Sequence, residues 1–284
     1  MSGVNPGEPG PDVRRRPSNL QLRLLTAAVG LPAVAAVIYA GGWVLAVAAA
    51  GIALLAAAEF THGWLLPTQP IRSVARLWPG LAAAAAMVAG AHWDERFIGA
   101  GLVLALFCVA AGYGPAQVFG PRKPYRVQAW CLGYVGLLAS TLVLVRDADS
   151  GREWLFLAVL STFAVDTGAY AVGRLTGRHL MAPRISPKKT WEGAAGGYVA
   201  GVAAVLGLNA LFDTGTGAWT MLPFALVMPV AAEVGDLFES WMKRRMGVKD
   251  ASGLLPGHGG FLDRLDSVLF GVPLLYLFLR LRVL

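Results

Sequence analysis

Long runs of apolar residues alternate with short polar segments along most of the chain after residue 20. Each run approaches the ~20 residues that cross ~30 Å of hydrocarbon as a helix. Nine such runs cover residues 22–40, 42–60, 76–92, 96–113, 128–145, 153–173, 193–212, 218–240 and 266–284. Because a helix satisfies its backbone hydrogen bonds internally, the pattern predicts an all-α, polytopic membrane bundle. The run at 76–92 is rich in alanine and weakly apolar, so eight spans are the alternative to nine.

The composition supports a membrane protein. Of the 284 residues, 56% are hydrophobic and only 14% are charged, whereas an ordinary soluble domain has roughly 25% charged residues. The chain therefore lacks the polar coat that a soluble fold of this length needs. Cys108 and Cys131 both lie inside apolar runs, so we expect neither a disulfide framework nor a thiolate metal cluster.

The chain divides into a tail and a single membrane domain. Residues 1–20 are polar and rich in Pro, Gly and Arg, without an aromatic residue, which is typical of a disordered tail. A cleavable signal peptide is not expected, because the first apolar run follows this long tail. Residues 21–284 are then one transmembrane domain.

Basic residues are distributed unevenly between the two sides of the predicted bundle. If the N-terminus lies in the cytoplasm, most of the 24 Lys and Arg residues fall in cytoplasmic segments. The opposite side holds Arg96, Arg146, Arg152, Arg280 and Arg282. This bias predicts a cytoplasmic N-terminus and an external C-terminus. The net charge of +7 is then explained by topology and lipid headgroups, and no nucleic-acid partner is expected.

The last polar segment, residues 236–267, carries paired carboxylates at two predicted helix ends. Asp236 and Glu239 are three residues apart, as are Asp263 and Asp266, so each pair shares a helix face. Such a group would repel itself without a cation, and Mg²⁺ is commonly held by one or two carboxylates together with substrate phosphates. A simpler alternative is that Asp263 and Asp266 only stabilise a helix N-terminus.

Basic residues and a glycine-rich turn are interleaved with these acids. Lys243, Arg244, Lys249 and Arg264 are candidates for phosphate contacts. The turn at 256–260 contains His258 between glycines, and its backbone amides could face an anion. The alternatives are an ordinary positive-inside loop, which we favour for Arg245, and an ordinary tight turn.

A second polar segment runs from Asp166 to Glu192. Asp166 falls late in an apolar run, with Tyr170 one helical turn later, and ionisable groups at membrane depth usually line a polar cavity. Ser186, Lys188 and Lys189 supply phosphate-type donors, although attraction to headgroups also explains the lysines. Thr190 is placed to cap the following helix, with Glu192 in its first turn. Glu59 and Glu233 are expected to be structural partners of the basic loops.

Residues 240–267, SWMKRRMGVKDASGLLPGHGGFLDRLDS, resemble the signature of CDP-diacylglycerol synthases, also called phosphatidate cytidylyltransferases. The pattern is Ser, two residues, Lys-Arg, four residues, Lys-Asp, a Pro-x-His-Gly-Gly turn and Asp-Arg-x-Asp. Every fixed position is met. The segments DTGAYAVGR and SPKKTWEG resemble accompanying motifs of that family, and the resemblance covers roughly residues 20–284.

The resemblance implies an integral enzyme of the plasma membrane that joins CTP and phosphatidic acid into CDP-diacylglycerol and pyrophosphate at a Mg²⁺-dependent, cytoplasm-facing site. It supports a metal centre in this segment, for which Asp236, Asp263 and Asp266 are the ligands we expect. The catalytic residues would be Lys243, Arg244, Lys249, His258, Asp263 and Arg264. The substrate pocket would include Asp166, Ser186, Lys188, Lys189, Lys243, Arg244, Lys249 and Arg264. A second cation and a homodimer stay open, and the rival functions are an ion-coupled transporter and a CTP-dependent lipid kinase.

Overall fold

The computed structural model describes residues 19–65, 78–113, 129–212, 214–248, 252 and 260–283. The first helices are α1 (Asn19–Ala40), α2 (Gly42–Leu65), α4 (Trp78–Gly90) and α5 (Arg96–Tyr113). A π-helical turn, η2 (Leu132–Leu137), leads into α8 (Leu138–Asp147), followed by α9 (Gly151–Thr176) and α10 (Trp191–Phe212). The chain ends with α11 (Ala218–Met246), the short α12 (Leu262–Leu265) and α13 (Val268–Val283).

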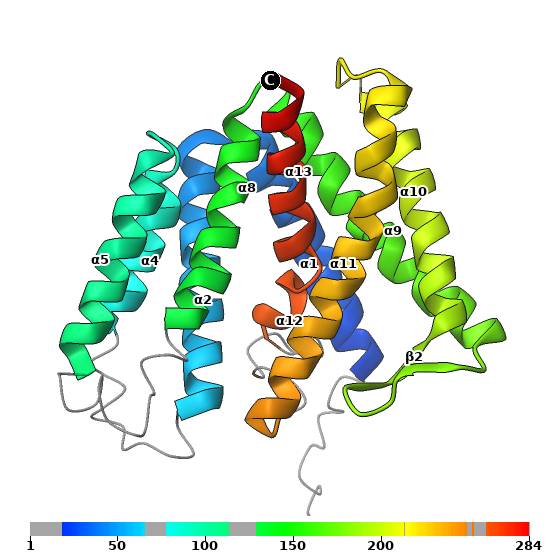
Figure 1. Cartoon of the computed structure of the whole chain (residues 1–284), viewed down its shortest axis with the longest axis horizontal. Coiled ribbons are helices and arrows are strands. Elements are labelled where there is room, and N and C mark those ends of the chain that lie inside the picture. Colours follow the sequence, from blue (N-terminus) through cyan, green and yellow to red (C-terminus); the bar gives the residue numbers. More distant parts are fainter. Residues whose placement is uncertain are drawn as a thin grey trace, which may run out of the picture.

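Each predicted apolar run coincides with helix, and the helices run up and down beside one another (Figure 1). Within the described residues, five helical segments are long and apolar enough to cross a membrane. They are Gly42–Gly63, Ala129–Asp147, Gly151–Thr176, Trp191–Phe212 and Ala218–Met246. The remaining runs form shorter apolar helices, α4 among them. The predicted all-α membrane bundle is confirmed, while the number of spans stays a prediction.

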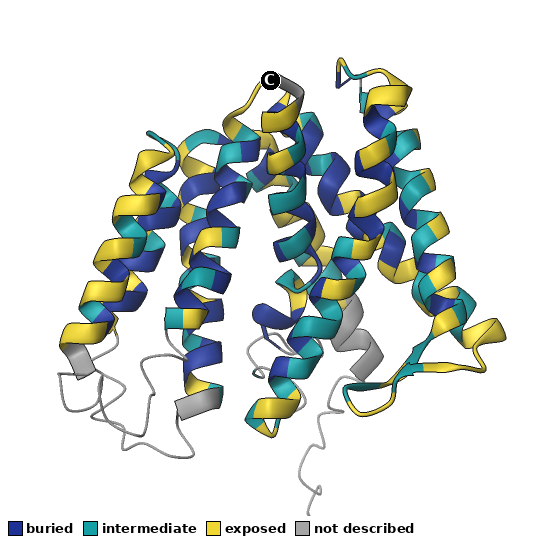
Figure 2. Cartoon of the chain, viewed as in Figure 1, coloured by how far each residue is buried: buried dark blue, intermediate teal, exposed yellow. Residues whose placement is uncertain are grey.

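The burial pattern matches a bundle surrounded by lipid. Side chains such as Phe60, Trp154 and Met228 are fully buried between helices. Figure 2 shows exposed positions along the helices. Many of them carry large apolar side chains; Leu211 and Val199 on α10, for example, are 72% and 66% exposed. Such surfaces are unfavourable in water and suited to hydrocarbon. Cys108 and Cys131 are both free, and Cys131 is buried.

Three of the basic residues predicted to share one side gather at one end of the bundle. Arg146 Nε donates to the carbonyl of Ile38 at 2.8 Å, and Arg152 lies over the ring of Tyr39. Arg280 forms an ion pair with Glu95 at 3.0 Å. This end also holds the C-terminus (Figure 1). The cytoplasmic location of the N-terminus stays a prediction.

The segment before α10 contains a hairpin that the sequence patterns did not predict. Strand β1 (Leu180–Ala182) pairs antiparallel with β2 (Ser186–Thr190) at the end of the bundle opposite the C-terminus (Figure 1). The predicted cap is confirmed, because the amide of Gly193 donates to Thr190 Oγ1 at 3.1 Å. Glu192 accepts the amide of His179 at 3.2 Å, so it ties the start of the hairpin to α10.

The end of α11 is fixed by a left-handed glycine. Gly247 has φ +75°, and its amide bonds to the carbonyl of Arg244, while the amide of Val248 bonds to that of Lys243. This cap satisfies carbonyls of the last helical turn. Lys243 and Arg244 are therefore held in regular helix at the same end of the bundle as the hairpin.

Candidate active site

Lys243 joins two acidic residues from different elements. Its ammonium nitrogen lies 3.1 Å from Glu239 Oε2, one turn earlier on α11, and 2.7 Å from Asp263 Oδ1 on α12. The side chains of Lys243 and Asp263 are 13% and 5% exposed, and that of Glu239 is fully buried. Removing a charge from water is costly unless an opposite charge is close by. The three buried side chains are therefore held against one another.

Both oxygens of Asp263 have donors. While Oδ1 contacts Lys243, Oδ2 accepts the amide of Gly260 at 2.8 Å. A carboxylate held by two donors from separate elements has little freedom to rotate. The candidate catalytic residue Asp263 is therefore fixed in orientation.

A second ion pair connects the hairpin to α11. Lys189 Nζ on β2 lies 2.8 Å from Asp236 Oδ2, and Ser240 Oγ donates to Asp236 Oδ1 at 3.4 Å. Arg244 reaches the same hairpin, because its Nε donates to the carbonyl of Ile185 at 3.0 Å. Residues from the two polar segments, far apart in sequence, thus meet in one charged cluster.

Asp266 and Glu239 are two carboxyl groups that interact electrostatically. The amide of Ser267 donates to Asp266 Oδ1 at 2.7 Å. Among the described residues, no N–H or O–H group donates to the buried Glu239 Oε1.

The three predicted metal ligands do not converge on one point in this conformation. Among the described residues, no three Asp, Glu, His or Cys side chains are grouped closely enough to hold an ion. Asp236 and Asp263 instead face Lys189 and Lys243. The pair of Glu239 and Asp266 fits Mg²⁺ better, since an orphaned carboxylate oxygen beside a second carboxyl group suits an ion that also takes phosphate oxygens.

Four of the other predicted site residues, Asp166, Ser186, Lys188 and Arg264, are among the described residues. Asp166 has an accessible side chain on α9, within electrostatic range of Asp236 and Asp266. Ser186 is half-buried at the start of β2, and Lys188 and Arg264 are exposed. Lys249 and His258 lie outside the described residues.

Glu239 and Glu59 contribute more to the site than the sequence patterns indicate. Glu239 shares a helix face with Asp236, but the predicted metal ligands do not include it. The prediction that Glu59 is a structural partner of a basic loop is confirmed, because its carboxylate accepts hydrogen bonds from Ser252, Phe261 and Leu262 of the segment 236–267. No spacing rule links residue 59 to residues some 200 positions later. For Glu233, the described part of the chain offers its buried Oε1 no hydrogen-bond partner.

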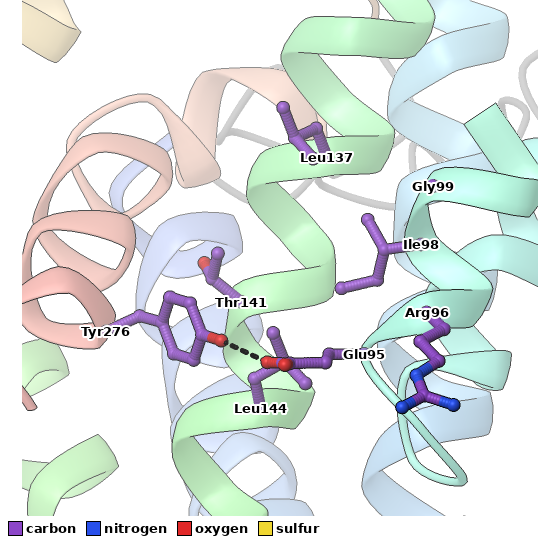
Figure 3. A pocket seen from close by; sticks show the side chains of 8 residues that line it. All are labelled: Glu95, Arg96, Ile98, Gly99, Leu137, Thr141, Leu144 and Tyr276. Atoms are coloured by element: carbon purple, nitrogen blue, oxygen red, sulfur yellow. Dashed lines mark hydrogen bonds between the residues drawn. The ribbon is translucent and has the colours of Figure 1, made fainter. Parts of the chain in front are cut away.

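A cavity elsewhere in the bundle contains none of the predicted site residues. It measures about 450 Å³ between α5, η2, α8 and α13 and is lined by both apolar and polar side chains (Figure 3). Glu95 lies in its wall and accepts a hydrogen bond from the hydroxyl of Tyr276 at 2.9 Å. Because Glu95 and its partner Arg280 mark the opposite end of the bundle, this cavity is distinct from the charged cluster.

The fold and the cluster define an integral membrane protein that gathers alternating carboxylates and cations at one end of its helices. The chain belongs to the cytidylyltransferase family, whose model matches residues 21–282. The match covers all of the elements that build the charged cluster.

Curated relatives carry a more specific name. The phosphatidate cytidylyltransferase of Mycobacterium bovis is 42% identical over 136 residues, 48% of this chain and 44% of that protein. Those of Brucella suis and Staphylococcus saprophyticus are 43% and 38% identical over 148 and 161 residues. These matches cover 52% and 56% of this chain, and 54% and 61% of the relatives. The aligned part of the chain spans about half the length of the curated relatives it matches.

Proposed function

We propose that this protein is a phosphatidate cytidylyltransferase, which converts CTP and phosphatidic acid into CDP-diacylglycerol and pyrophosphate. The observation that carries the proposal is the convergence of Lys189, Lys243 and Asp263 from three elements at one end of a membrane bundle. The family membership and the names of the relatives support it.

The proposed reaction needs no side-chain nucleophile. An anionic phosphate oxygen of phosphatidate attacks the α-phosphorus of CTP and forms a new P–O bond. The bond from that phosphorus to the oxygen bridging to the β-phosphate breaks, and pyrophosphate leaves with the electron pair. The main obstacle is the repulsion between two anionic substrates, so catalysis rests on placement and charge neutralisation.

The basic side chains supply that neutralisation in distinct ways. Lys243 is fixed between Glu239 and Asp263, so it offers a positioned positive charge. Arg264 and Lys188 are exposed and are assigned to phosphates that approach from outside the protein. Arg244 holds the hairpin by its contact with Ile185, and its remaining donors are assigned to the same phosphates.

Magnesium is assigned to the Glu239 and Asp266 pair, with Asp236 and Asp263 at the border of the site. When bound, the ion supplies charge neutralisation for the triphosphate and the leaving pyrophosphate. The lysine partners of Asp236 and Asp263 hold those carboxylates in place without it. A second cation stays open within this proposal.

The proposed site faces the cytoplasm at the plasma membrane. The distribution of basic residues supports this orientation by the positive-inside bias. The phosphate of phosphatidate would stay at headgroup level at the helix ends, while CTP arrives from the aqueous side. The clustering of ionisable residues at one helix end also argues against a transporter, whose polar groups would gather near the midplane.

The test is a product assay with purified protein, CTP, phosphatidate and Mg²⁺. Formation of CDP-diacylglycerol with equimolar pyrophosphate is the expected result. Release of CDP with a phosphorylated lipid would instead identify a lipid kinase. Absence of any product in a folded, lipid-reconstituted preparation that moves ions across vesicles would overturn the proposal in favour of a transporter.

A further inference from the structure

Glu59 connects α2 to the polypeptide that carries the candidate catalytic residues. Its Oε1 accepts the hydroxyl of Ser252 at 2.6 Å and the amide of Phe261 at 3.1 Å. Its Oε2 accepts the amide of Leu262 at 3.0 Å. One buried carboxylate thereby binds the segment at residue 252 and again at residues 261–262.

Successive amides of this turn are divided between two carboxylates. Gly260 donates to Asp263, and the next two amides donate to Glu59. The turn therefore orients Asp263 through the amide of Gly260, and Glu59 on α2 holds the turn through the amides of Phe261 and Leu262. If Phe261 and Leu262 shift, the amide that holds Asp263 shifts with them.

Gly260 is packed directly against the Glu59 carboxylate. A Cβ added at this position would lie 2.5 Å from Glu59 Oε2 and 2.9 Å from its carboxyl carbon, closer than any ordinary contact. The Glu59 side chain could move aside only by breaking its hydrogen bonds to Ser252, Phe261 and Leu262. A glycine here lets the backbone approach the carboxylate closely enough for the next two amides to bond to it.

Glu59 is a buried carboxylate inside an apolar helix, a position that needs hydrogen-bond donors. It is 5% exposed and lies within Gly42–Gly63, a segment apolar enough to cross a membrane. A buried carboxylate is costly unless its oxygens accept hydrogen bonds. The donors to Glu59 come from the segment that carries Asp263. The Glu59 carboxylate can therefore be buried at low cost only when that segment is in place.

We propose that Glu59 is a positioning residue of the active site: it anchors residues 252 and 260–262 to α2 and thereby holds Asp263 against Lys243. The inference deepens the proposed function and rests on it for its catalytic consequence. The anchoring itself does not depend on which reaction the site performs.

The first experiment compares Glu59→Gln and Glu59→Asp with the wild-type protein in lipid nanodiscs. Gln keeps the size of the side chain but faces at least one donor with its own NH₂ group, so kcat is expected to fall at least ~10-fold with KM for CTP changed less than ~3-fold. Asp keeps the charge and is expected to retain more activity than Gln. Glu95→Gln, which removes a carboxylate with two partners at the other end of the bundle, is the matched control and should retain wild-type activity.

Hydrogen exchange gives a readout that does not require turnover. In Glu59→Gln, a peptide covering residues 260–266 is expected to exchange at least ~10-fold faster, because two amides lose charge-assisted hydrogen bonds. Peptides from α9 and α10 should be unchanged, and Glu95→Gln should leave residues 260–266 protected. Unchanged exchange at 260–266 in folded Glu59→Gln would overturn the anchor.

A double-mutant cycle tests the contact itself. Gly260→Ala is expected to lower kcat in the wild-type background by pressing against the carboxylate, and to have little further effect in Glu59→Ala, where that space is free. Independent, multiplicative effects would contradict the proposed coupling.

If the wild-type protein makes no CDP-diacylglycerol, the proposed function fails, while the exchange experiment still decides whether Glu59 anchors the segment. If the wild type is active and Glu59→Gln keeps full kcat, the positioning role fails and the function stands.

Discussion

The ammonium nitrogen of Lys243 lies 2.7 Å from Oδ1 of Asp263, across 20 residues of sequence and from one helix to another. Both side chains are largely buried. Breaking a buried pair by removing one charge typically costs ~3–5 kcal/mol, because the other charge is left uncompensated. The pair is therefore the rigid centre from which the remaining charges of the site are arranged.

Asp263→Asn is expected to lower the rate of CDP-diacylglycerol formation at least ~10²-fold, as for the loss of a preorganised electrostatic group. The amide keeps the shape but withdraws the negative charge that holds Lys243. The measurement is kcat of the purified variant with CTP and phosphatidate. Asp147→Asn, which removes a carboxylate paired with His92 away from the site, is the control and should stay near wild-type activity. A folded Asp263→Asn protein with near wild-type turnover would remove Asp263 from the site.

Helices were predictable because the bilayer imposes one strong rule on every span. A long apolar run has to satisfy its backbone internally, so the runs at 153–173 and 193–212 correspond to α9 and α10. The hairpin was missed since its strands, Leu180–Ala182 and Ser186–Thr190, are short and lack an alternating pattern. In polar segments at a membrane surface, water can satisfy the backbone, so the sequence does not dictate one secondary structure.

The two lysines of β2 are expected to differ in kinetic effect. Lys189 is paired with Asp236 at 2.8 Å, whereas Lys188 is exposed. Lys189→Gln should lower kcat ~10-fold or more, because Asp236 loses the charge that fixes it, while Lys188→Gln should mainly raise the KM for CTP or phosphatidate. Steady-state kinetics with each substrate varied in turn separates the two effects. Equal kcat losses in both variants would contradict this division.

The carboxyl pair of Glu239 and Asp266 predicts a specific response to magnesium. Chelation with EDTA is expected to abolish activity and added Mg²⁺ to restore it. In Asp266→Asn and Glu239→Gln, the Mg²⁺ concentration for half-maximal rate should rise at least ~10-fold, since each substitution removes one of two anionic oxygen donors. Glu153→Gln, next to Arg152, serves as control. An unchanged Mg²⁺ requirement in both variants would place the ion elsewhere.

The charged cluster was predictable in its members but not in its pairings. Spacing indicated that Asp236 and Glu239 share a face of a helix, and both do lie on α11. Which carboxylate meets which lysine depends on how α11, α12 and β2 approach one another, and no local pattern encodes that approach. Glu59 shows the same limit, because its partners at residues 261 and 262 are joined to it only by the packing of α12 on α2.

Deletion of residues 1–18 is expected to leave specific activity within ~3-fold of the full chain, because a polar segment without core-forming residues contributes no packing. The family match begins at residue 21, which places the deleted part outside the shared fold. The run Arg14–Arg16 is expected to contribute to orientation and headgroup attraction, so the amount of inserted protein has to be measured separately. Full-length protein with these three arginines replaced by glutamine isolates the charge effect from the loss of chain. A correctly inserted truncation whose activity falls far below that of the full chain would show that the tail acts at the site.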